Sequence, residues 1–304
     1  MNHISSSQDT STTLTARTRT TRSIAVVATT GPILLAVGWL LIGHLPNSPL
    51  WIAVLRVLPA GLILLMLRPA WPTGAWWHRS TILGLANFGG FFTLQTVAVH
   101  HIPVGVAATI AATQTLLVPF GAAVLVNTPL RGAQLIYAST GFLGVALLLL
   151  RSSEQLDPLG IAAAAGTALC NTLGLLLTRR WAHPNGVHHL SATGWQMTAG
   201  GLLLLPAAVV TEGSIPPLTT ATLATAAVLV ASTGAAFAVL FGAVHAGLPT
   251  AAISRLMLLC PVTVTLAGWL IYQHTLTPLQ LLGATLVFIP VVAVCNPKST
   301  RPPA

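Results

Sequence analysis

The chain has 304 residues, of which 54% are hydrophobic and only 6% are charged. Because soluble globular domains carry roughly 25% charged residues, this composition excludes a water-soluble enzyme. A net charge of +9 suggests nucleic-acid binding in a soluble protein, but here the basic residues stand singly or in pairs between apolar runs. We therefore expect no nucleic-acid partner, and the composition instead predicts a protein embedded in the lipid bilayer.

Long apolar runs bounded by polar residues, glycine or proline predict an all-α integral membrane protein with ten transmembrane helices. In chain order these helices cover residues 23–43, 50–67, 81–99, 104–126, 132–150, 159–178, 192–210, 220–243, 250–272 and 278–294. The connections are too short to hold a soluble domain. Residues 1–22 are rich in Ser and Thr and are expected to form a disordered cytoplasmic tail, although a signal or transit peptide has a similar composition. Residues 296–304 form a second cytoplasmic tail.

The distribution of basic residues predicts a multi-pass protein of the cytoplasmic membrane with both termini in the cytoplasm. Under this threading the opposite face carries only Arg151, and Arg56 and Arg255 fall within spans. Such an asymmetry is the positive-inside signal. The basic residues on the predicted inner side are Arg17, Arg19, Arg22, Arg68, Arg79, Arg131, Arg179, Arg180, Lys298 and Arg301.

The two halves of the chain resemble each other, which predicts two five-helix repeats at residues 23–151 and 158–295. Pro119 and Gln134 in the first half have counterparts in Pro261 and Gln280, at a shift of about 140–146 residues. Because five is an odd number, the second repeat enters the membrane from the opposite side and the repeats are inverted. Inverted repeats are typical of secondary transporters that expose one site alternately to either side. Pro119 and Pro261 are the expected paired hinges.

This layout resembles the EamA family of the drug/metabolite transporter superfamily, which has ten helices in two EamA repeats. The residues that carry the resemblance are Leu55-Arg56, Ala107-Ala108 with Pro119, Ala251-Ala252 with Pro261, and the segment Leu276-Thr277-Pro278-Leu279-Gln280-Leu281-Leu282-Gly283-Ala284. The resemblance implies an inner-membrane carrier that exports small metabolites such as amino acids or their analogues by alternating access. It also implies a central cavity between the halves, with the fifth and tenth helices at the periphery.

The sequence departs from the family pattern after the fourth and ninth helices. The family usually has a glutamate in the short turn at these points, whereas the matching stretches here read Asn127-Thr128-Pro129 and Gln273-His274. Whatever that acid contributes to packing, gating or coupling in relatives is therefore not carried over to this chain.

Arg56 and Arg255 are candidate substrate-binding residues because ionisable groups inside a membrane are costly and usually functional. Each lies about 9 Å from the end of its predicted helix. No predicted span contains Asp or Glu, so either guanidinium is free to bind a substrate carboxylate or phosphate. In the alternative interpretation, each long side chain snorkels to the membrane interface.

Several uncharged polar side chains within the spans are candidates to line a substrate cavity. An amide that faced lipid would leave its hydrogen-bonding groups unmet, and a tryptophan could stack on a substrate. Contacts between helices are the alternative role for such residues. The candidates are Trp39, Asn87, Gln95, Gln114, Asn171 and Gln196.

Other functions are less well supported by the sequence. A carrier for phosphorylated or nucleotide-linked sugars would need more cationic charge at mid-membrane than two arginines. The pairs His100-His101 and His188-His189 suggest a membrane haem or metal protein, but they sit at helix ends, and no Cys or acid lies near the second pair. We expect no enzymatic activity, no cofactor and no metal, a small-molecule substrate, and either a monomer or a homodimer. The lack of acids in the spans favours facilitated transport or exchange over proton coupling. A titrating histidine such as His100, His101, His245 or His274 is the alternative.

Overall fold

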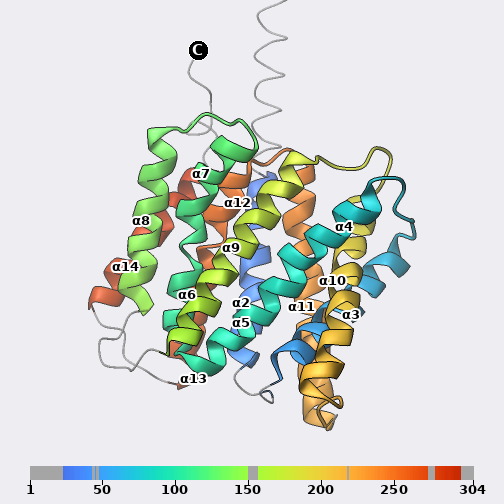
Figure 1. The fold of residues 1–304 in the computed structure, drawn as a ribbon. Coiled ribbons are helices and arrows are strands. Elements are labelled where there is room, and N and C mark those ends of the chain that lie inside the picture. The colour runs from blue at the N-terminus through green and yellow to red at the C-terminus, as the bar shows by residue number, and fades with distance from the viewer. Residues whose placement is uncertain are drawn as a thin grey trace, which may run out of the picture.

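The computed structural model describes residues 23–42, 45, 48–149, 157–217, 219–272 and 278–295, and every element in these ranges is helical (Figure 1). The helices are α2 (Thr30–Ile42), α3 (Pro49–Leu67), α4 (Trp76–Gly84), the π-helix η1 (Leu85–Gly89), α5 (Gly90–His101), α6 (Val104–Ala111), α7 (Gln114–Leu125), α8 (Gly132–Leu149), α9 (Pro158–Arg180), α10 (His189–Glu212), α11 (Thr220–His245), α12 (Thr250–Leu256), α13 (Leu259–Tyr272) and α14 (Pro278–Cys295). The two tails predicted at 1–22 and 296–304 lie outside the described residues.

The all-helical prediction is confirmed. Within the described residues, seven helical runs are long and apolar enough to cross a membrane: Ser23–Ile42, Pro49–Leu67, Trp76–His101, Val106–Leu125, Pro158–Arg180, His189–Glu212 and Thr220–His245. Shorter apolar helices lie at Gly132–Leu147, Thr250–Val264 and Leu281–Ala293, where the fifth, ninth and tenth spans were expected. The multi-pass architecture is thus established, while a count of ten crossings stays a prediction.

Local sequence explains where several helices begin. Pro49, Pro158 and Pro278 stand in the first turn of α3, α9 and α14, where a missing backbone N–H costs nothing. The Asp157 carboxylate caps α9 by accepting a hydrogen bond from the backbone N–H of Leu159 at 2.9 Å.

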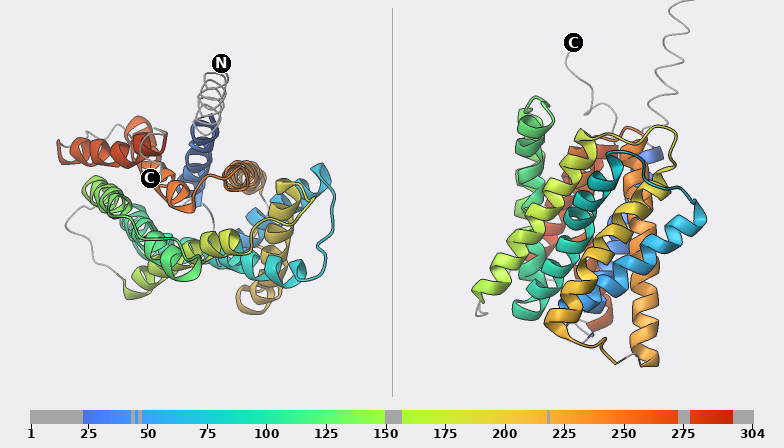
Figure 2. Two further views of the ribbon diagram at one scale, coloured as in Figure 1. Left: turned by 90° about the horizontal axis from the view of Figure 1, so that it is seen from above. Right: turned by 45° about the vertical axis from the view of Figure 1, so that its right-hand side comes forward.

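The contacts between helices repeat when the two halves of the chain are exchanged. Helices α3 and α10 pack on each other, as do α8 and α14 at the far edge of the molecule (Figures 1 and 2). The contact of α5 with α9 has its counterpart in that of α11 with α2, and the contact of α7 with α9 has its counterpart in that of α13 with α2. This pattern is that of a pseudo-two-fold axis relating the halves.

Helices α3 and α10, which occupy equivalent places in the two halves, run antiparallel. At the start of α3, the indole N–H of Trp51 donates to the carbonyl of Gly213, just past the end of α10, at 3.2 Å. At the start of α10, the indole N–H of Trp195 donates to the carbonyl of Ala70, just past the end of α3, at 2.7 Å. The same bond is therefore made twice, at opposite ends of the pair.

The fourth and ninth predicted helices are both interrupted at matching places. The chain leaves regular helix at Ala112–Thr113, between α6 and α7, and at Met257–Leu258, between α12 and α13. In each break a tighter i to i+3 bond replaces the helical one: the N–H of Thr115 donates to the carbonyl of Ala112, and that of Cys260 to the carbonyl of Met257, both at 3.0 Å.

Only one of the two expected hinge prolines explains its break. Pro261 has no N–H to give to the carbonyl of Met257, so the α12–α13 break follows from the sequence. Pro119 lies inside α7, past the break at Ala112–Thr113, and does not cause it. Motion at either proline stays a prediction.

Charged residues separate to the two ends of the bundle. Arg79 lies over the Trp181 ring at 5.8 Å, and Arg180 donates to the carbonyl of Leu125 at 3.2 Å, both at the end where α9 finishes. We call this the basic end. Asp157 begins α9, and Glu212 ends α10 beside the start of α3, so the acids lie at the opposite, acidic end.

Candidate functional site

A small cavity of about 40 Å³ lies between the halves at the two helix breaks; we call it the central cavity. Ala112 and Met257, one from each break, both line it. Its other lining residues are Trp39, Phe91, Ala108, Ala111, Gln114, Thr167, Asn171, Leu258, Cys260, Pro261 and Val264. The structure thus brings together three of the predicted substrate-binding residues, Trp39, Gln114 and Asn171, with the predicted hinge Pro261.

Arg56 lies in the centre of the bundle and does not snorkel, because only 1% of its surface is exposed. Its Nε donates to the Thr233 hydroxyl at 2.5 Å, and its guanidinium stacks 4.0 Å from the ring centroid of Phe92. The two terminal nitrogens have no hydrogen-bond partner among the described residues. Gly38 makes room for them, since a Cβ there would overlap the guanidinium.

Arg255 is also buried, but it points to a different part of the molecule. Its Nε donates to the carbonyl of Ala251 on its own helix at 3.0 Å. Its guanidinium lies 5.4 Å from the ring centroid of Tyr137 on α8, at the edge of the bundle. The structure therefore does not bring the two candidate arginines together.

Asn87 and Gln196 meet across three helices. The Asn87 side chain lies in the π-helix η1 and donates from Nδ2 to Gln196 Oε1 on α10 and to the Thr178 hydroxyl on α9, each at 3.3 Å. Gly174 permits this approach, because a Cβ there would overlap the Asn87 amide. Gln95 is also buried, and its Oε1 has no partner among the described residues, but it lines neither of the cavities described in this subsection.

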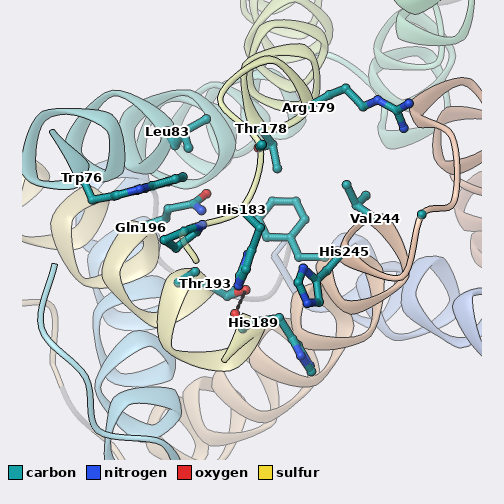
Figure 3. Close-up of a pocket in the computed structure, with 15 residues that line it drawn as sticks. Trp76, Leu83, Thr178, Arg179, His183, His189, Thr193, Gln196, Val244 and His245 are labelled. Atoms are coloured by element: carbon teal, nitrogen blue, oxygen red, sulfur yellow. Dashed lines mark hydrogen bonds between the residues drawn. The ribbon is translucent and has the colours of Figure 1, made fainter. Parts of the chain in front are cut away.

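A larger pocket of about 330 Å³ opens at the basic end, and we call it the vestibule (Figure 3). Gln196 is the one predicted site residue among those that line this pocket. Imidazoles of His183, His189 and His245 also line it. The full lining is Trp76, Leu83, Thr178, Arg179, Ala182, His183, Pro184, His189, Ala192, Thr193, Gln196, Phe241, Val244, His245 and Gly247.

Sequence reasoning missed most of the vestibule. The sequence marks the pair His188-His189 only as a weakly supported metal or haem candidate, and the predicted site does not include Trp76. In the described part of the chain, no group of three or more His, Cys, Asp or Glu side chains is arranged to hold a metal ion. The usable signal was that histidines recur at the adjoining ends of the helices around residues 180–189 and 245.

Comparisons with known proteins agree with this architecture. The model of the EamA-like transporter family matches residues 22–150 and again residues 158–295. Protein PecM of Dickeya dadantii (strain 3937) is 34% identical over 250 residues, which cover 82% of this chain and 83% of PecM. A solved crystal structure with 21% identity superimposes with a TM-score of 0.72 over 90% of this chain and 98% of its own, which shows a shared fold. The resemblance seen in the sequence is confirmed, and the chain belongs to the EamA-like transporter family, with two EamA repeats.

Proposed function

We propose that this protein is a secondary transporter of the cytoplasmic membrane that exports small metabolites, such as amino acids or their analogues, by alternating access. Family membership makes it a membrane transporter. The observation that carries the finer proposal is the central cavity, where an interrupted helix from each half contributes to one lining. Interrupted helices at the interface of two repeats are where secondary transporters bind substrate.

The antiparallel packing of α3 and α10 supports alternating access. Because equivalent helices run in opposite directions, an exchange of conformations between the halves would close one end of the molecule and open the other. The cavities are unequal at the two ends: about 330 Å³ at the basic end and about 20 Å³ beside the start of α3 at the acidic end. This difference supports a state that opens toward the basic end.

The basic end is the proposed cytoplasmic side. Arg79 and Arg180 lie there, while Asp157 and Glu212 lie at the other end, which fits the positive-inside pattern. Labelling of single cysteines placed at Arg180 and at Asp157 tests this orientation. Access to a membrane-impermeant reagent from the outside at Arg180, rather than at Asp157, would contradict it.

Arg56 is the proposed binding group for the substrate's anion. Arg56 lines the cavity of about 20 Å³ at the acidic end rather than the central cavity. Its two terminal nitrogens are buried, and a carboxylate would satisfy both in a bidentate pair. Arg255 is turned toward Tyr137, so the centre holds one arginine. One cation favours a singly charged metabolite over a phosphorylated or nucleotide-linked sugar.

A resistance screen tests the proposal. The protein is expressed in a sensitive host, the cells are challenged with toxic amino acids and their analogues, and growth is compared with that of an empty-vector strain. We expect resistance to at least one compound, loss of that resistance with Arg56→Ala, and its retention with the control Arg68→Ala on the exposed end of α3. Equal resistance with and without the protein across the panel would refute metabolite export.

A further inference from the structure

The vestibule contains a cluster of titratable side chains that the proposed substrate route does not require. The ring centroids of His183 and His245 are 4.0 Å apart, and those of His189 and His245 are 6.3 Å apart. His188 adjoins the cluster, with its ring centroid 4.3 Å from that of His189. In Figure 3 the imidazoles of His183 and His245 face each other, with Trp76 on the other side of His183.

The surroundings of this cluster are basic. Arg179 on α9 lines the same pocket, and Arg79 on α4 lies 5.5 Å from the Trp76 ring that forms one wall. None of the lining residues that the structure describes is an acid. Since the histidines have no carboxylate to pair with, an anion that enters the vestibule meets only neutral and positive groups.

The surroundings of His183 disfavour its charged form. Burial lowers the pKa of His183 below its ordinary value, and the neighbouring His245 and His188 lower it further, while a hydrogen bond to the carbonyl of Val187 acts in the opposite direction. A bound anion reverses this balance, because an opposite charge nearby favours the protonated imidazole.

We propose that the vestibule binds the anionic head group of a small organic acid, and that the His183–His245 pair takes up a proton from water when the acid binds. The proton returns to solvent when the anion leaves. A volume of about 330 Å³ holds a molecule the size of an aromatic amino acid, and Trp76 and Phe241 supply apolar walls for its body. This inference rests on the proposed transport function, because it names the substrate class that enters by this route.

Benzoate and benzamide are matched probes for the site, since they share a ring and differ in charge. Binding to the purified protein in detergent is followed from pH 5.5 to 7.5 through the NMR signals of isotopically labelled histidine rings. We expect benzoate to raise the pKa of His183 and to bind more weakly as the pH rises, by up to about tenfold per pH unit for one linked proton. Benzamide should change neither.

Variants locate the proton. His183→Gln and His245→Gln should each flatten the pH dependence of benzoate binding, whereas the control His78→Gln, which is exposed on α4, should leave it unchanged. Absence of benzoate binding at pH 5.5, equal binding of benzamide, or an unchanged pH profile in both variants would overturn the proposal. If the variants unfold, the comparison of the two probes on the unaltered protein decides.

The outcomes separate this inference from the proposed function. Proton-linked benzoate binding without any export in the resistance screen leaves the site standing and removes the export proposal. Export that persists with its pH profile unchanged in His183→Gln and His245→Gln removes the site and leaves the export proposal standing.

Discussion

Replacing Arg56 with methionine separates a binding role from a structural role. In the structure, burial of the guanidinium costs several kcal/mol. The bond from Nε to Thr233 returns about 1.5–3 kcal/mol, and stacking on Phe92 returns about 0.5–2 kcal/mol. These contributions roughly offset the burial, and the two terminal nitrogens gain nothing without a ligand.

Methionine fills a similar volume without the charge, so Arg56→Met should hardly alter the free energy of unfolding. Replacing a buried ion pair with well-packed apolar side chains is often neutral or stabilising by about 1–4 kcal/mol, and we expect the same of this guanidinium, whose terminal nitrogens have no partner among the described residues. Transport should respond very differently. Two charge-assisted bonds to a substrate anion are worth at least about 3 kcal/mol, and their loss weakens binding by roughly 100-fold.

The assay has two readouts on the same preparation. Unfolding is followed in detergent by thermal denaturation, and transport is followed in proteoliposomes with a metabolite identified by the resistance screen. Arg255→Met is the matched control, because it removes a second buried arginine that faces Tyr137 at the edge of the bundle. We expect it to transport at nearly the parental rate.

One result would refute this reasoning. If Arg56→Met lowered the free energy of unfolding by more than about 3 kcal/mol while the folded fraction transported normally, the arginine would be holding helices together. The unpaired nitrogens would then have no functional meaning.

Three further predictions follow from single contacts. Gly38→Ala should reduce transport and cost about 1–3 kcal/mol of stability, measured by thermal unfolding, because its Cβ would displace the Arg56 guanidinium. Glu212→Ala should cost about 1–2 kcal/mol, and Glu212→Gln less, because the carboxylate caps the start of α3; an unfolding midpoint unchanged by both would contradict this. The hydrogen bond from His101 keeps the pKa of Asp157 below its ordinary 3.8. The ionised carboxylate therefore stabilises the fold above pH 3.8, and this stabilisation is lost as the pH falls through the folded-state pKa. The difference in unfolding free energy between the parent and Asp157→Asn should accordingly vanish in acid.

The sequence predicted the helices well because their signals are local. An apolar run ended by proline, glycine or a charge needs no knowledge of its neighbours, and the ten expected segments match the helical runs of the described chain closely. The ends differ by a few residues: the third begins at Trp76 rather than at 81, and the seventh also runs beyond its predicted bounds. It extends to Glu212, beyond the predicted end at residue 210, because the carboxylate finds its partners at the start of α3 rather than in water.

The site was harder to predict because it depends on rotation and on contacts between distant segments. The depth of Arg255 in its helix follows from sequence, but its turn toward Tyr137 is set by packing on α8. Asn87 and Gln95 are both predicted to line a substrate cavity, yet Asn87 lies in the π-helix η1 and donates to Gln196, while Gln95 lines neither cavity. The vestibule needs four helices to meet, and no single stretch of sequence contains it.

The contacts between α3 and α10 differ at the two ends of the pair. The indole bonds of Trp51 and Trp195 occupy corresponding places at the two ends, but the one at the basic end is shorter, at 2.7 Å against 3.2 Å. Glu212 breaks the equivalence, because both of its oxygens accept backbone N–H groups at the start of α3, at 2.8 and 3.0 Å. The corresponding place at the basic end belongs to Arg68, whose carbonyl accepts one bond from the Ser191 hydroxyl. A carboxylate on a helix N-terminus is a stronger contact than a neutral bond, so the Glu212 contact favours separation of α3 from α10 at the basic end, where the larger cavity lies, while the shorter Trp195 bond opposes it.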